Sequence, residues 1–168
     1  MCYCRLAGYS SQESRERVQT AIKNAGLHFP RHRIVVNLAP AAVRKEGPAY
    51  DLPIALGVIM LAGHLPSDIV DGSLVVGELS LDGVVRHTRG LLPMAATARA
   101  NGYRRMFVPE VDAPEAALIP GLEVIPVKSL ADLYKHLSGR QLIESYQVSS
   151  KDELEPLFIP TDFSEIKG

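Results

Sequence analysis

Apolar residues recur at helical spacing in two long segments of this 168-residue chain. Residues 11–25 carry Val18 and Ile22 on one helical face, and Gly26 follows where a helix would close in the left-handed conformation. Residues 51–62 are apolar on nearly every side. A helix of that kind has no solvent face, so we predict that it lies at the centre of the fold.

Short β-branched runs alternate with further helical segments in the rest of the chain. A turn at residues 81–83 predicts a hairpin. This alternation favours an α/β fold, specifically an α+β sandwich in which helices pack on a mixed sheet. The expected strands cover residues 32–38, 73–80, 84–86, 105–108 and 122–127, and the remaining helices cover residues 91–101, 113–118 and 130–137.

The periodicity fades at both ends of the chain. Residues 1–10 are irregular, and residues 139–168 carry charges, Pro156 and Pro160 without a repeating apolar pattern. We therefore expect one folded domain over residues 11–138, followed by a linker over residues 139–168.

The charge balance narrows the choice of partners. The chain has 18 basic and 19 acidic residues, a formal net charge of -1. This balance gives the whole chain no attraction to nucleic acid or to an anionic membrane, although a local basic surface is compatible with it. The longest apolar run, residues 54–62, is too short to span a bilayer, and the first nine residues do not form a secretory signal. We expect a cytoplasmic protein without membrane association.

The sequence offers little for a cofactor. Residues 121–129 (GLEVIPVKS) end in Lys-Ser as a P-loop does, but the second glycine is missing and strand-forming residues take the place of the loop. The five histidines do not show metal-binding spacing. We therefore predict no cofactor, no metal and no small-molecule substrate for this chain.

A cluster of basic residues follows the first predicted helix. Arg31 and Arg33 lie near the start of a predicted strand, and Arg44 and Lys45 lie in the loop after it. Such residues are able to contact phosphates, which would give salt-dependent binding of DNA. Because Glu46 lies among them, a solvated charged face is the alternative interpretation.

Several sequence blocks carry a resemblance to one known family. They are residues 13–26 (ESRERVQTAIKNAG), 36–48 (VNLAPAAVRKEGP), 44–56 (RKEGPAYDLPIAL) and 77–94 (GELSLDGVVRHTRGLLPM). They resemble the N-terminal domain of ComM/YifB-type magnesium-chelatase-like AAA+ ATPases. In that family the domain precedes an ATPase that assembles as a hexameric ring, and ComM drives branch migration of DNA in natural transformation.

The resemblance implies an accessory role for this chain, in oligomerisation or substrate engagement. Residues 162–168 (DFSEIKG) resemble the segment just upstream of the family's ATPase module, so we expect the chain to stop before that module. The resemblance then implies that the ATPase module binds ATP and Mg²⁺ and that the homo-oligomer assembles through this module. The family has additional strands before the helix at residues 13–26, so we expect the chain to be truncated at its N-terminus as well.

The same domain resembles the proteolytic domain of Lon proteases, which has a ribosomal-protein-type α/β fold and a Ser–Lys dyad. The resemblance puts Ala49 at the serine position and Leu92 at the lysine position. Neither side chain has a nucleophile or a proton acceptor, so we expect no catalytic residue in this chain. The resemblance also puts Lys45 and Arg89 on the loops that flank the former cleft. With Arg31, Arg33 and Arg44 they form our candidate binding surface.

Three alternatives remain beside the accessory role. The first is an active Lon-like peptidase, against which Ala49 and Leu92 argue directly. The second is a magnesium chelatase subunit, and the third is a stand-alone interaction domain.

Overall fold

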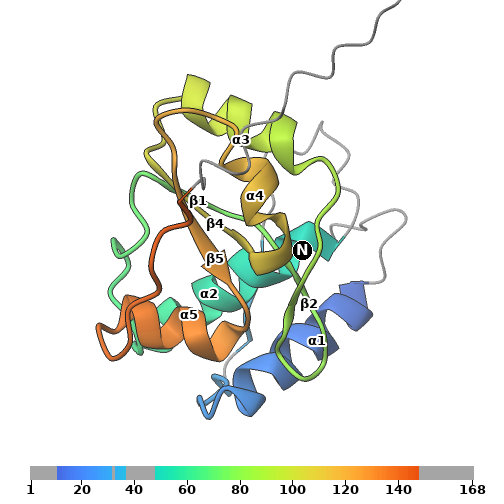
Figure 1. The fold of residues 1–168 in the computed structure, drawn as a ribbon. Coiled ribbons are helices and arrows are strands. Elements are labelled where there is room, and N and C mark those ends of the chain that lie inside the picture. Colours follow the sequence, from blue (N-terminus) through green and yellow to red (C-terminus); the bar gives the residue numbers. More distant parts are fainter. Residues whose placement is uncertain (1–10, 32, 37–47, 148–168) are drawn as a thin grey trace, which may run out of the picture.

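A parallel sheet of three strands forms the centre of the protein (Figure 1). The computed structural model describes residues 11–31, 33–36 and 48–147. The strands β1 (Ser73–Val75), β4 (Arg105–Pro109) and β5 (Glu123–Val127) pair in the order β1-β4-β5. The central strand β4 is buried from Met106 to Pro109, as expected for a strand with neighbours on both edges and helices on both faces.

Helices cover both faces of this sheet. Phe107 and Ile125 face the cluster formed with α1 (Ser11–Asn24), α2 (Asp51–Leu61) and α5 (Leu130–Leu137). The residues next to Phe107 on β4 and next to Ile125 on β5 face a second cluster, which is formed with α3 (Leu91–Ala100) and α4 (Ala113–Ala116). Successive strand residues point to opposite faces, so the alternation of side chains produces two cores and three layers. The predicted α/β sandwich is confirmed, and so is the buried central helix.

A separate hairpin stands beside the sheet. The strands β2 (Glu78–Leu79) and β3 (Val85–Arg86) pair antiparallel, and the turn between them carries Gly83 at φ 85°. The Asp82 carboxylate accepts hydrogen bonds from the Ser80 hydroxyl and the Val84 amide. These bonds stabilise the charged form and lower the pKa of Asp82, the Ser80 bond contributing most.

Two expected strands differ from the structure. The strand expected over residues 73–80 is divided between the two sheets, because the chain leaves β1 before Gly77 and the Gly77 amide donates to the Ala49 carbonyl instead of to a strand. The strand expected over residues 32–38 is absent from its described part, residues 33–36, where Val35 is 76% exposed. Residues 32, 37 and 38 lie outside the described residues.

A buried carboxylate joins α1 to α2. Asp51 is 1% exposed and accepts hydrogen bonds from the Ser14 hydroxyl at 2.7 Å and the Arg17 guanidinium at 2.8 Å. Tyr50 takes the N-cap position of α2 without a side-chain bond, and the Asp51 carboxylate in the first turn is bonded to α1. A short 3₁₀ turn, η1 (Pro48–Tyr50), leads into α2.

The chain after α5 lies against the domain as far as residue 147. The Ile143 amide donates to His136 Nδ1 at 2.9 Å, and the Tyr146 amide donates to the Val124 carbonyl at 2.7 Å. Ile143 and Tyr146 pack against the two cores. The first residues of the stretch interpreted as a linker are therefore attached to the sheet and to α5.

The contact between His136 and Ile143 predicts an acid-dependent loss of stability. His136 Nδ1 accepts this hydrogen bond, so it is unprotonated. Burial lowers the pKa of His136 from its ordinary value of 6.5, and the positive charge of Arg105 lowers it further, whereas the negative charge of Glu123 raises it. As the pH falls, the unfolded chain binds this proton first. The contribution to stability is therefore complete above pH 6.5 and decreases as the pH falls through 6.5 towards the lower pKa of the folded state.

Urea unfolding at about pH 7.5 and about pH 5.5 measures this effect. We expect His136→Gln to lose less stability than the unsubstituted chain over this interval, because glutamine does not titrate. An equal loss in both proteins would contradict the assignment to His136.

Candidate functional site

The two positions where the Lon resemblance predicts a dyad, Ala49 and Leu92, lie at the starts of helices. Ala49 is half-buried in η1, and its carbonyl accepts a hydrogen bond from the Gly77 amide at 3.0 Å. Leu92 is 36% exposed in the first turn of α3, where its amide donates to the Glu115 carboxylate at 3.0 Å. The described contacts of both residues are therefore structural, and neither side chain supplies a nucleophile or a base.

The predicted binding surface is divided in the structure. Arg31, Arg33 and Arg89 are exposed, whereas Arg44 and Lys45 lie outside the described residues. Arg31 lines a groove to which Arg33 and Arg89 do not contribute.

Arg89 belongs to a fixed turn between β3 and α3. The buried carboxylate of Asp112 contacts His87 Nδ1 at 2.5 Å and accepts a hydrogen bond from the Thr88 amide at 2.8 Å. These contacts hold the turn against the short η2 helix (Glu110–Asp112), which precedes α4. Arg89 is thus presented on a different part of the fold from the groove that contains Arg31.

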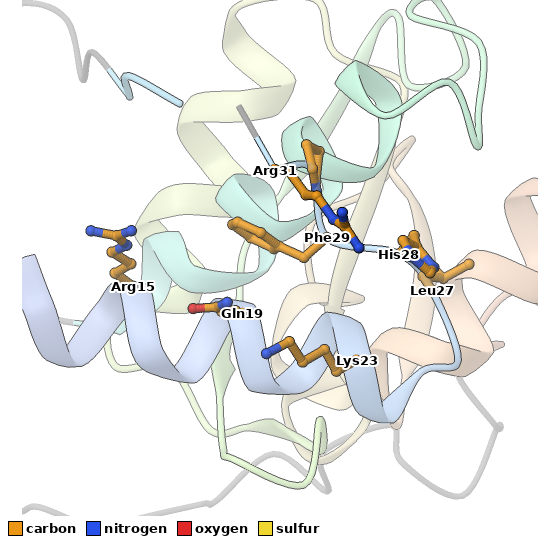
Figure 2. Close-up of a pocket in the computed structure, with 8 residues that line it drawn as sticks. Arg15, Gln19, Lys23, Leu27, His28, Phe29 and Arg31 are labelled. Carbon is orange, nitrogen blue, oxygen red and sulfur yellow. The ribbon is translucent and has the colours of Figure 1, made fainter. Parts of the chain in front are cut away.

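The groove that contains Arg31 has a volume of about 490 Å³ (Figure 2). One wall is α1, which contributes Arg15, Gln19 and Lys23, and the other is the segment from Leu27 to Arg31 that returns after α1. The lining residues are Arg15, Gln19, Lys23, Leu27, His28, Phe29, Pro30 and Arg31.

Helical periodicity places three of these residues in one row. Arg15, Gln19 and Lys23 are four residues apart, and residues at that spacing lie on the same side of a helix. The apolar side of the helix, with Val18 and Ile22, is buried in the core and fixes the rotation of α1. The polar row is consequently left along the mouth of the groove.

The second wall is fixed by the end of α1. Gly26 adopts φ 75°, and the Leu27 amide then donates to the Ile22 carbonyl at 3.1 Å. Leu27 and Phe29 pack against the core, which holds the returning segment beside the helix. The predicted left-handed closure at Gly26 is confirmed, and it brings Arg31 back beside α1.

The groove is cationic. Arg15, Lys23 and Arg31 line it, whereas its lining residues include no aspartate or glutamate. Within the part of the chain that the structure describes, none of these three side chains forms an ion pair, unlike Arg17, which binds Asp51. Three positive charges around one concave surface, without a carboxylate among its lining residues, favour an anionic ligand.

Sequence reasoning found Arg31 but missed Arg15 and Lys23. Their spacing with Gln19 was visible in the predicted helix, and it could have indicated a polar row. The position of Arg31 across from that row depends on the turn after Gly26, which no local pattern specifies.

A second, apolar groove of about 420 Å³ lies between α2 and residues 34–36. Its exposed side chains include Val35 and Leu61. No helix in the described residues is long and apolar enough to cross a bilayer. Among the same residues, no group of three or more His, Cys, Asp or Glu side chains is placed to hold a metal ion.

Comparison with known proteins gives a family match over most of the domain. Residues 4–112 match the family described as subunit ChlI of Mg-chelatase. An uncharacterized protein of Mycobacterium tuberculosis is 39% identical over 128 residues, which cover 76% of this chain and 25% of that protein. The competence protein ComM of Haemophilus influenzae is 34% identical over 130 residues, 77% of this chain and 25% of ComM.

Lon proteases are also similar. Lon protease 2 of Bacillus subtilis is 27% identical over 120 residues, 70% of this chain and 21% of that protease. This chain therefore spans about a quarter of the length of the first relatives that it matches. The resemblance to both groups that the sequence blocks predicted is confirmed.

Proposed function

We propose that this chain, which belongs to the family of subunit ChlI of Mg-chelatase and is a ComM-like member of it, acts as a non-catalytic accessory domain that engages nucleic acid. In this proposal the α1 groove contacts phosphates on behalf of a larger ATP-driven DNA-processing machine. ATP, Mg²⁺ and assembly into a homo-oligomer would be functions of an AAA+ module.

The observation that carries the proposal is a set of groove cations that form no ion pair with any residue the structure describes. Arg15, Lys23 and Arg31 line one concave surface without a carboxylate among its lining residues. The whole chain has a net charge of -1, so a general electrostatic attraction would not explain binding of DNA. The proposal therefore requires that binding depends on these particular side chains.

Titration of the chain with a fluorescent oligonucleotide at two salt concentrations tests the proposal. Three phosphate contacts on a single strand predict a slope of about -2 for log K against log salt concentration. Affinity should then decrease about 20-fold between about 50 mM and about 200 mM salt. If the chain binds no oligonucleotide at the lower salt concentration, the nucleic-acid part of the proposal is wrong.

The similarity to Lon proteases makes a peptidase the second candidate. Ala49 and Leu92 stand where the resemblance expects serine and lysine, so we predict that a fluorophosphonate probe leaves the chain unlabelled. Trypsin, labelled in parallel, controls for the probe. Labelling at any serine of the chain that disappears on unfolding would contradict the non-catalytic role.

A further inference from the structure

An aromatic ring lies inside the cationic groove. Phe29 is half-buried, packs against the core with part of its surface and lines the groove with another part. In the view of Figure 2 its ring lies beside α1, between Arg15 and Arg31. A phenyl ring contributes nothing to the binding of a bare phosphate, so the part of Phe29 that lines the groove suits a ligand that carries a ring as well as phosphate groups.

The row of polar residues on α1 is long enough to follow a nucleic-acid backbone. Arg15 and Lys23 are eight residues apart, which corresponds to about 12 Å along a helix. A stacked strand carries a phosphate about every 3.4 Å, so this length corresponds to about three phosphates. Gln19 lies between the two cations and can donate a hydrogen bond to the same backbone.

The combination of cations and one aromatic ring discriminates between single and double strands. In a duplex the faces of the bases are stacked on one another inside the helix, so a ring beside the backbone does not reach them. In a single strand a base can turn towards the protein and stack on an aromatic side chain, and this stacking does not depend on the base sequence. The volume of the groove, about 490 Å³, is within the range of small-molecule binding sites.

We infer that the α1 groove is a site for single-stranded nucleic acid, in which Arg15, Lys23 and Arg31 contact backbone phosphates from the two walls and one base stacks on Phe29. This inference rests on the proposed function and adds the strand preference and the stacking residue. The apolar packing of Phe29 against the core holds the ring in place, so the stacking surface exists before the ligand binds.

The test measures the binding of three probes to the full 168-residue chain. They are an oligothymidine of about 20 nucleotides, the DNA duplex of that strand with oligodeoxyadenosine, and inorganic polyphosphate of similar charge. We compare Phe29→Leu with the unsubstituted protein. Leucine keeps an apolar side chain at the core, and Phe29→Tyr restores an aromatic face as the matched rescue.

We expect the single strand to bind more tightly than the duplex. Phe29→Leu should weaken single-strand binding at least about fivefold, with duplex and polyphosphate binding unchanged, and Phe29→Tyr should restore it. Thermal unfolding of both variants establishes that they are folded.

Two other results are informative. Equal affinities for single strand and duplex that Phe29→Leu does not change would overturn the inference and leave the proposed function standing. Absence of binding to both the single strand and the duplex would overturn the proposed function, and the inference with it.

Discussion

Replacement of Asp51 by alanine is expected to lower the free energy of unfolding by about 3 kcal/mol. The Asp51 carboxylate is 1% exposed and receives bonds from Ser14 and Arg17, both on α1. Its removal leaves a largely buried guanidinium without this counter-charge, and it removes the bonds from Ser14 and Arg17 that join α1 to the start of α2. Such a loss is a large part of the stability of a domain of this size.

Urea unfolding followed by circular dichroism measures this change. Ser14→Ala removes one hydrogen bond and keeps the charge pair, so it should cost only about 1 kcal/mol. If Asp51→Ala were no more destabilising than Ser14→Ala, the buried pair between Arg17 and Asp51 would not stabilise the junction of the two helices.

Removal of two groove cations is expected to weaken binding of a single-stranded oligonucleotide about 20-fold at about 0.1 M salt. Arg15→Ala combined with Arg31→Ala removes one charge from each wall of the groove. Neither residue forms an ion pair among the described residues, so the substitutions break no salt bridge there. The salt slope should decrease in magnitude by about 1.4, because two phosphate contacts are lost.

The matched control is Arg86→Ala combined with Arg104→Ala. These two arginines are exposed and lie outside the groove lining, so the control loses the same formal charge. We expect its affinity and salt slope to remain close to those of the unsubstituted chain. Equal weakening by both double substitutions would show that overall charge, and not the groove, determines binding.

The sequence predicts elements better than it predicts which of them lie together. The sequence predicts that the helix at residues 51–62 is buried, because a helix that is apolar on nearly every side is stable only in the core. The strand expected over residues 73–80 is divided because the Gly77 amide bonds to the Ala49 carbonyl, and Gly77 is also packed tightly. A Cβ there would lie 2.7 Å from Val85 Cγ1, a contact that depends on tertiary structure and leaves no local signal.

The candidate site shows the same limit. Arg31 belongs to the predicted basic surface, whereas Arg15 and Lys23 do not, because a charged helix face by itself does not indicate a site. The partners of Asp51 on α1 are more than thirty residues away in sequence, so no local pattern indicates them. In both cases the missing information was which distant segment packs beside the residue.

Photo-crosslinking of a bound oligothymidine, followed by mass spectrometry of the crosslinked peptides, tests most directly whether the α1 groove engages nucleic acid. The account predicts crosslinks within residues 15–31, above all at Phe29, and their loss when Arg15 and Arg31 are replaced by alanine. Crosslinks that instead concentrate around Arg86 and Arg89, and that remain when Arg15 and Arg31 are replaced by alanine, would contradict binding in the α1 groove.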